Sequence, residues 1–168
     1  MKRETYENMY REVYRSGLGP VLNVVSTVIS ILIAALYAVS LVLAVMNDML
    51  TGVRFILLTA IPFLLVTLLR RIVNRPRPYE VISLPELSYL RKKGRAGRSF
   101  PSRHVASAMI VGGAVIPLFP LLGVFTMIMG VALGACRVLC GRHFLRDVVA
   151  GGVIGLVAGI IAAALVGF

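Results

Sequence analysis

The hydrophobic and polar positions of this chain form long apolar segments separated by short polar connections. The first segment, residues 21–46, holds 26 positions without a charged residue. As a helix rising about 1.5 Å per residue, it is long enough to cross roughly 30 Å of hydrocarbon with some tilt. A cleaved signal peptide would have a shorter apolar run, followed by a small-residue cleavage pattern that this segment lacks. We therefore interpret residues 21–46 as a membrane-spanning helix.

Four further apolar segments follow, and together the five predict an all-α membrane protein with a bundle of about five transmembrane helices. Three of the uncharged cores are short. We expect their ends to extend through polar residues or to lie in a thinned or protein-lined region of the membrane. The four segments are residues 55–73, 105–119, 121–135 and 148–168.

The residues before the first span predict an amphipathic helix within positions 1–19, so that residues 20–168 form the helical bundle of a single membrane-embedded domain. A helix with tyrosines on one face and charges on the other is expected to lie in the membrane interface, with its tyrosines at headgroup depth. Docking of this helix on the protein's own loops is the alternative. Its apolar face consists of Tyr6, Met9, Tyr10, Val13 and Tyr14.

The glycines and cysteines of the last two spans are explained by the structure of the bundle without a role in the chemistry. Glycines at four-residue intervals let helix backbones approach closely in lipid, and we predict packing within the bundle in preference to dimerisation. Cys136 and Cys140 lie four residues apart with nothing nearby to complete a metal site, so we predict free thiols. The glycines are Gly130, Gly134, Gly151, Gly155 and Gly159.

The connectivity of five antiparallel spans gathers the polar residues at one membrane face. The end of the second span, the start of the third, the end of the fourth and the start of the fifth all meet there, whereas the opposite face has only Asp48 and Arg54. Ionisable groups at membrane depth are costly and are usually functional. The residues predicted at this face are Arg70, Arg71, Arg75, Arg77, Ser102, Arg103, His104, Arg137, Arg142, His143, Arg146 and Asp147.

The composition adds a net charge of +11, from 18 Lys and Arg against 7 Asp and Glu. Nucleic-acid binding would fit this charge, but the chain lacks a soluble domain and interleaved aromatic residues, so we predict no nucleic-acid partner. Part of the charge has simpler interpretations. Arg91, Lys92, Lys93 and Arg95 suit a solvated or headgroup-facing loop, and Arg71, Arg75, Arg142 and Arg146 suit interfacial anchors.

The other polar side chains at this face are suited to binding a phosphate group. Arginines present planar donor forks to phosphate oxygens, and helix starts near Ser102 and His143 add backbone N–H groups. The four-residue spacing of His143 and Asp147 would place both on one helix face, where the carboxylate orients the imidazole for attack on phosphorus. His104 could then protonate the leaving oxygen. One carboxylate is too few for a two-metal site, so we predict chemistry without a metal or cofactor.

Three motifs in this region resemble those of the type 2 phosphatidic acid phosphatase superfamily, which shares its site with vanadium haloperoxidases and glucose-6-phosphatase. The family motifs are Lys-x6-Arg-Pro, Pro-Ser-Gly-His and Ser-Arg-x5-His-x3-Asp. All three occur here in order, between residues 70 and 147. They read Arg70-x6-Arg77-Pro78, Pro101-Ser102-Arg103-His104 and Cys136-Arg137-x5-His143-x3-Asp147.

The resemblance implies a role for each matched residue. His143 would be the nucleophile that forms a phosphohistidine, Asp147 would orient it, and His104 would be the general acid. Arg103 stands where the family has glycine and adds a guanidinium for a second phosphate or a headgroup. Arg70 replaces a lysine and Cys136 a serine. The residues expected to bind the phosphoryl group are Arg70, Arg77, Ser102, Arg103 and Arg137.

The expected substrate is a phosphate or pyrophosphate on a membrane lipid, because the site lies at the membrane face beside a basic loop. Family members act on several such lipids, and we favour a polyprenyl pyrophosphate or phosphatidylglycerophosphate. A non-catalytic protein that binds or transports a lipid headgroup is the alternative, but it would have no use for two histidines and Asp147.

Two arguments give opposite predictions for the side of the membrane on which the site lies. All Lys and Arg residues except Arg54 fall on the site face, and the positive-inside rule then places the site on the cytoplasmic side of the cell membrane. The family resemblance implies the outer side. We favour the cytoplasmic orientation, because the basic residues before the first span and after residue 90 have no catalytic explanation.

Overall fold

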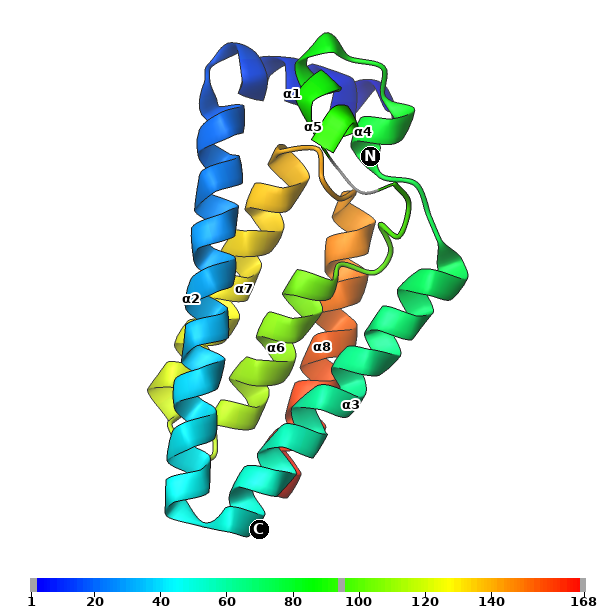
Figure 1. Cartoon of the computed structure of the whole chain (residues 1–168). Helices are drawn as coiled ribbons and strands as arrows, with labels where there is room; N and C mark the ends of the chain where they lie inside the picture. Colours follow the sequence, from blue (N-terminus) through cyan, green and yellow to red (C-terminus); the bar gives the residue numbers. More distant parts are fainter. Residues whose placement is uncertain (1–2, 94–95, 167–168) are drawn as a thin grey trace.

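The computed structural model describes residues 3–93 and 96–166, and the regular elements in these ranges are all helices, with no strand. Five helices form the bundle in the order of the five predicted apolar segments, each of which is thereby confirmed as helical (Figure 1). Helices that follow one another in the chain run in opposite directions, and their connections lie at the two ends of the bundle. The helices are α2 (Leu18–Asn47), α3 (Met49–Val73), α6 (Arg103–Val115), α7 (Pro120–Leu139) and α8 (Leu145–Val166).

Four of the bundle helices, α2, α3, α7 and α8, are long and apolar enough to cross a membrane. The fifth, α6, has 13 residues and measures about 20 Å. The other helices enclose it, since every residue from Val105 to Val115 except Ser107 is buried. The expectation that a short span would lie in a protein-lined region therefore holds for α6.

The turn between α2 and α3 shows why the second span begins earlier than predicted. Asp48 ends α2 in an extended conformation, and its side chain accepts a hydrogen bond of 3.0 Å from the backbone N–H of Thr51. This N-cap starts α3 at Met49. The predicted start at residue 55 is wrong because it was set by the charge of Arg54, which the helix accommodates in its second turn.

The glycines of α8 allow it to pack tightly against α6. A Cβ atom at Gly151 would lie 2.4 Å from the carbonyl oxygen of Ser102, and one at Gly155 would lie 2.5 Å from that of Ala106. Any side chain at these positions would push the two helices apart. The predicted packing of the glycines within the bundle is therefore confirmed for α8.

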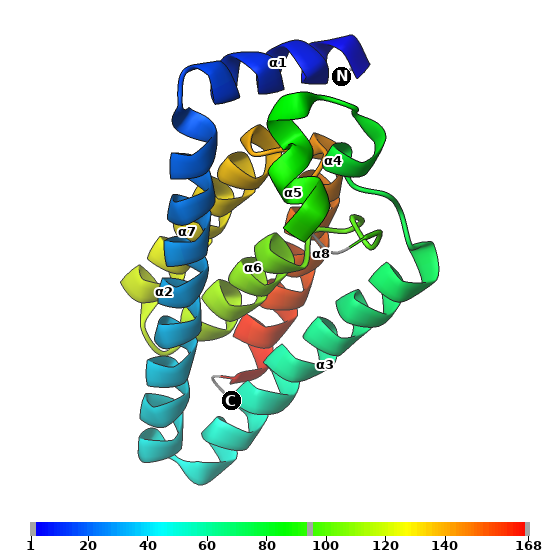
Figure 2. The ribbon, with the colours of Figure 1, turned by 45° about the horizontal axis from the view of Figure 1, so that its top comes forward.

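The N-terminal helix α1 (Arg3–Arg15) lies across the end of the bundle, above the loop that joins α3 to α6 (Figure 2). Tyr6 and Tyr10 are buried against Leu87 and other apolar residues of that loop. The structure thus shows these two tyrosines docked on the protein's own loop, and the location of the helix in the membrane interface stays a prediction. The loop contains α4 (Pro78–Val81), the 3-10 turn η1 (Pro85–Leu87) and α5 (Ser88–Lys93).

Candidate active site

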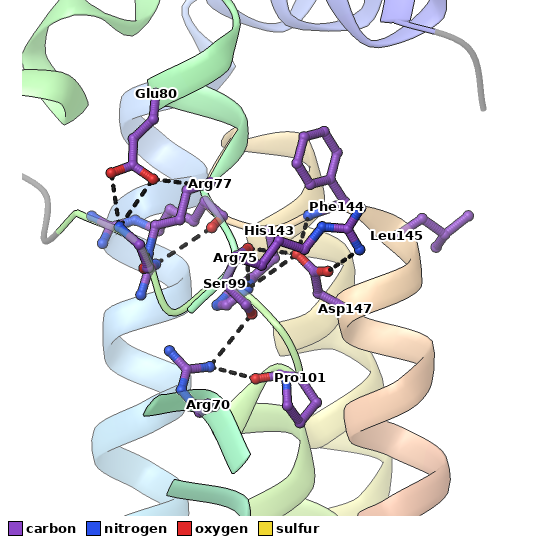
Figure 3. A network of polar contacts seen from close by, with 12 residues as sticks. Arg70, Arg75, Arg77, Glu80, Ser99, Pro101, His143, Phe144, Leu145 and Asp147 are labelled. Atoms are coloured by element: carbon purple, nitrogen blue, oxygen red, sulfur yellow. Dashed lines mark hydrogen bonds and ion pairs between the residues drawn. The ribbon is translucent and has the colours of Figure 1, made fainter. Parts of the chain in front are cut away.

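The candidate site lies at the end of the bundle that α1 covers. The connection after α3, the residues just before α6, and the turn between α7 and α8 converge there (Figure 3). His143 occupies the turn between α7 and α8 and is 1% exposed. Its backbone N–H donates a 3.2 Å hydrogen bond to the carbonyl of Arg137, which fixes the turn.

Three side chains form a row at the centre of the site. Ser99 Oγ donates a 2.5 Å hydrogen bond to Asp147 Oδ2 and lies 3.4 Å from His143 Nδ1. The direct distance from His143 Nδ1 to Asp147 Oδ2 is 3.9 Å. The single hydroxyl proton of Ser99 is used on the carboxylate, so Nδ1 is the donor to Ser99 Oγ. The imidazole therefore carries its proton on Nδ1 and presents the lone pair of Nε2.

Asp147 is held by the start of α8. Its Oδ2 accepts a 3.0 Å hydrogen bond from the backbone N–H of Phe144, the residue before the helix, in the manner of half a capping box. Arg75 Nη1 lies 3.9 Å from its Oδ1. Since α8 begins at Leu145, the expectation that His143 and Asp147 share one helix face is wrong. The turn before the helix brings them together.

Burial sets the protonation of the imidazole. The pKa of His143 is lowered from its ordinary value to about 4, first by burial and then by repulsion from Arg77, Arg137 and Arg70, while the nearby Asp147 carboxylate acts to raise it. His143 is therefore neutral at neutral pH. Its lone pair is available to an electrophile there without prior deprotonation.

Two of the predicted phosphate ligands also support the connecting loop. Arg70 Nη1 donates to the carbonyl oxygens of Ser99 and Pro101. Arg77 donates from Nε to the carbonyl of Gly97 at 3.1 Å. Glu80 accepts from the backbone N–H groups of Arg77 and Gly97 at 2.6 and 2.8 Å, closing this arrangement. The loop carrying Ser99 is thus tied to the chain segment that follows α3.

Two other predicted ligands leave polar atoms without protein partners. Within the described part of the chain, Ser102 Oγ and Arg137 Nε are both buried and make no hydrogen bond. Arg137 Nη2 donates to Ser30 Oγ of α2 at 3.3 Å. A buried donor without a partner is costly, and the oxygens of a bound phosphate would satisfy both groups.

A cavity of about 400 Å³ opens between α2, α3 and α6. Arg103 and His104, from the first turn of α6, line it together with Ser30. The guanidinium carbon of Arg103 lies 5.4 Å from the centre of the Phe63 ring on α3. The cavity therefore has a cationic lining beside the site and an apolar lining among the helices.

The structure brings all eight predicted site residues to this end of the bundle. His143 and Asp147 are connected through Ser99, and the backbone N–H of Ser102 donates to the carbonyl of Asp147 at 2.7 Å. Arg70 and Arg77 contact the loop that carries Ser99. Arg103 and His104 belong to the cavity, and the charge of Arg137 acts on both histidines.

Sequence reasoning missed Ser99 and Glu80 and assigned Arg75 to interfacial anchoring. A carboxylate just after the Arg77-Pro78 pair was a usable signal for Glu80, but nothing distinguished Ser99 from other loop serines. Arg91 is also more than a solvated cation, because it donates to the carbonyls of Tyr79, Ile82 and Leu84. Arg95 of the same predicted loop lies outside the described residues.

The two cysteines are free thiols, as predicted, and both are buried.

Arg142, predicted as an anchor, donates from Nε to Asn23 Oδ1 at 2.7 Å and so links the site turn to α2. In residues 3–93 and 96–166, no group of three or more His, Cys, Asp or Glu side chains is arranged to hold a metal ion.

Comparison with known proteins identifies related sequences and folds. A family model described as the PAP2 superfamily matches residues 51–168, more than half of the chain. The lipid A 1-phosphatase of Rhizobium etli is 35% identical over 89 residues, covering 52% of this chain and 38% of that protein. The chain thus matches well under two thirds of the length of that relative.

Two crystal structures share the fold. LpxE from Aquifex aeolicus superposes with a TM-score of 0.56 at 21% identity, covering 85% of this chain and 92% of that one. A PAP2 type phosphatidylglycerolphosphate phosphatase from Bacillus subtilis gives a TM-score of 0.55 at 17% identity, with coverage of 95% and 91%.

Proposed function

Because this chain belongs to the PAP2 superfamily, we propose that it hydrolyses a phosphate monoester or diphosphate on a membrane lipid, without a metal, through a phosphohistidine. The observation that carries this proposal is the row of His143, Ser99 and Asp147 beside the unpartnered Ser102 Oγ and Arg137 Nε. It combines a nucleophile in a defined tautomer with buried donors suited to phosphate oxygens.

In the first step, His143 Nε2 attacks phosphorus while the bond from phosphorus to the lipid oxygen breaks. His104 gives a proton to the departing oxygen. Ser99 and Asp147 stabilise the positive charge that develops on the imidazole, since Nδ1–H donates toward the serine and the serine toward the carboxylate. Arg137, Ser102 and the helix start at Arg103 bind the oxygens of the phosphoryl group as their charge shifts.

In the second step, water attacks the phosphohistidine. His104, now neutral, accepts a proton from this water, and the bond between phosphorus and Nε2 breaks. Orthophosphate leaves and both histidines return to their starting states. Arg70 and Arg77 contribute positive charge near the phosphoryl group and also keep the loop with Ser99 in position.

The substrate is an amphiphile whose phosphate enters the site from the membrane. The cavity among α2, α3 and α6 supports this proposal, because it leads from His104 between helices that face lipid. Within this class we propose a polyprenyl pyrophosphate or phosphatidylglycerophosphate. The relatives named for lipid A and for phosphatidylglycerolphosphate add those lipids to the set to be tested.

We propose the cytoplasmic membrane as the location, with the site on its cytoplasmic side. The support is the distribution of charge, because all Lys and Arg residues other than Arg54 lie at the site end or before the first span. A substrate made on the inner leaflet would then reach the site directly.

The test is phosphate release by the purified full-length protein from a panel of lipid phosphates and diphosphates in excess chelator. Turnover of at least one lipid is expected, and His143→Ala serves as the inactive control. Tight binding without turnover would instead support a non-catalytic headgroup protein. Activity that is lost in chelator and restored by magnesium or zinc would contradict the metal-free mechanism.

A further inference from the structure

Arg103 occupies a position that is unfavourable for a cation unless an anion joins it. It is the first residue of α6, where the positive end of the helix dipole repels a guanidinium. It is half-buried, and the charge of Arg103 acts on Arg70 and His104. Among the ion pairs of the described residues, none includes Arg103. Its guanidinium lies over the Phe63 ring.

The location of Arg103 relates it to the leaving group. The phosphoryl group to be transferred contacts His143, and nucleophile and leaving group lie on opposite sides of phosphorus in an in-line displacement. His104, the proton donor to the leaving group, lines the cavity. The leaving group therefore lies on the cavity side, and Arg103 lines the same cavity.

We infer that Arg103 binds a second phosphate, the one that stays with the lipid when the terminal phosphate is removed, so that the preferred substrate is a lipid diphosphate. This inference rests on the proposed function and narrows it. His143 Nε2 forms a bond to the terminal phosphorus, and the bond from that phosphorus to the bridging oxygen breaks. The products after attack by water are orthophosphate and the lipid monophosphate.

The rest of the cavity suits the chain attached to such a headgroup. Below the arginine its lining is mostly apolar, and Tyr37 OH and Thr59 Oγ1 meet at 3.4 Å between α2 and α3. The apolar lining includes Ile33, Ala34, Ala60 and Leu133. A lipid whose charged headgroup binds Arg103 and whose hydrocarbon chain lies along the apolar lining would fit this cavity.

The experiment compares geranylgeranyl diphosphate with geranylgeranyl monophosphate, which differ only in the second phosphate. Initial rates of orthophosphate release in detergent micelles give kcat/KM for each. The wild type is expected to prefer the diphosphate. Arg103→Ala should lower kcat/KM for the diphosphate by about 10- to 100-fold, as for loss of one charge-assisted hydrogen bond. For the monophosphate, Arg103→Ala should lower kcat/KM by less than about threefold.

Two further variants complete the test. Arg103→Lys retains the charge and should keep most of the diphosphate preference, while Arg103→Gln should lose it if the alanine variant does not fold. Arg71→Ala, an exposed arginine on α3, is the matched control and should leave both rates unchanged. An equal loss on both lipids in the Arg103 variants would overturn the inference and leave the phosphatase proposal intact. Absence of release from every lipid phosphate would overturn both.

Discussion

Ser99 donates a hydrogen bond of 2.5 Å to Asp147, although the two residues are 48 positions apart in the chain. The serine oxygen also lies 3.4 Å from His143 Nδ1. Because imidazole and carboxylate are themselves 3.9 Å apart, the hydroxyl is the nearest group that can transmit the orienting effect of the carboxylate. Ser99 is thus a positioning residue for the proposed nucleophile.

Ser99→Ala is expected to lower kcat by about 10- to 100-fold, since the hydroxyl's hydrogen bond to the charged carboxylate and its contact with the imidazole are both lost. KM should change little because Ser99 does not touch the substrate. The measurement is steady-state phosphate release, with Ser83→Ala as the control for an exposed serine of the same connecting segment. A normal kcat in Ser99→Ala would show that the imidazole is oriented by the carboxylate alone.

His143→Ala is expected to abolish turnover while the protein still folds in detergent, because it removes the atom that bonds to phosphorus. Asp147→Asn should lose about 10³-fold or more, as seen when the acceptor that orients a catalytic imidazole is replaced. Brief incubation with a radiolabelled lipid phosphate, followed by quenching in alkali, should trap label on the wild type. Equal labelling of the His143→Ala variant would exclude His143 as the nucleophile.

The acid limb of the pH dependence of kcat/KM should lie at a pH well below the pKa of an ordinary histidine. Burial lowers the pKa of His143 to about 4, and only the neutral imidazole attacks. The kcat/KM value should therefore be retained as the pH falls through 6 and 5, and should decline near pH 4. Measurement of kcat/KM across this range tests the prediction. An acid limb centred near 6.5 would mean that the imidazole is solvated in the free protein.

Gly151→Ala and Gly152→Ala form a matched pair on α8. A Cβ at Gly151 meets the backbone of Ser102 at 2.4 Å, whereas one at Gly152 meets only Val105 Cγ1 at 3.8 Å. We expect Gly151→Ala to cost about 1–3 kcal/mol of stability and most of the activity. Gly152→Ala should be neutral or stabilise the helix by up to about 1 kcal/mol. Melting temperature and phosphate release in detergent report both effects, and equal behaviour of the two variants would contradict the close packing.

The proposed cytoplasmic orientation can be tested with single cysteines in a chain from which Cys136 and Cys140 have been removed. Lys92→Cys, exposed at the site end, should resist an impermeant thiol reagent in intact cells and react after lysis. Met49→Cys, 68% exposed at the opposite end, should react in intact cells. The reverse pattern would place the site outside, and recycling of an outer-leaflet lipid diphosphate would become the better proposal.

The number and order of the bundle helices could be predicted because uncharged runs in a membrane protein have few alternative structures. Connectivity then indicated which end carries the polar residues. Helix boundaries were harder to predict, because the N-cap at Asp48 and the turn before Leu145 depend on side-chain geometry as well as on hydropathy.

The partners of Ser99, Glu80 and Arg75 could not be predicted from the sequence. Their contacts exist because residues 97–99 lie against the chain that follows α3 and against the start of α8, and no periodicity specifies that path. His143 and Asp147 were paired correctly but for the wrong reason. Their spacing fits one helix face, and the structure instead joins them through a turn and a serine.

The enclosure of α6 separates the reacting groups from the thickness of the surrounding membrane. A bilayer that thickens or thins acts on helices in contact with lipid, which respond by tilting. Ser102 and His104 are attached to a helix that is covered by its neighbours and held in register with α8 by backbone contact at Gly151 and Gly155. The other helices can follow the membrane while α6 and α8 stay in register, so that the spacing between Ser102, His104 and Asp147 is kept.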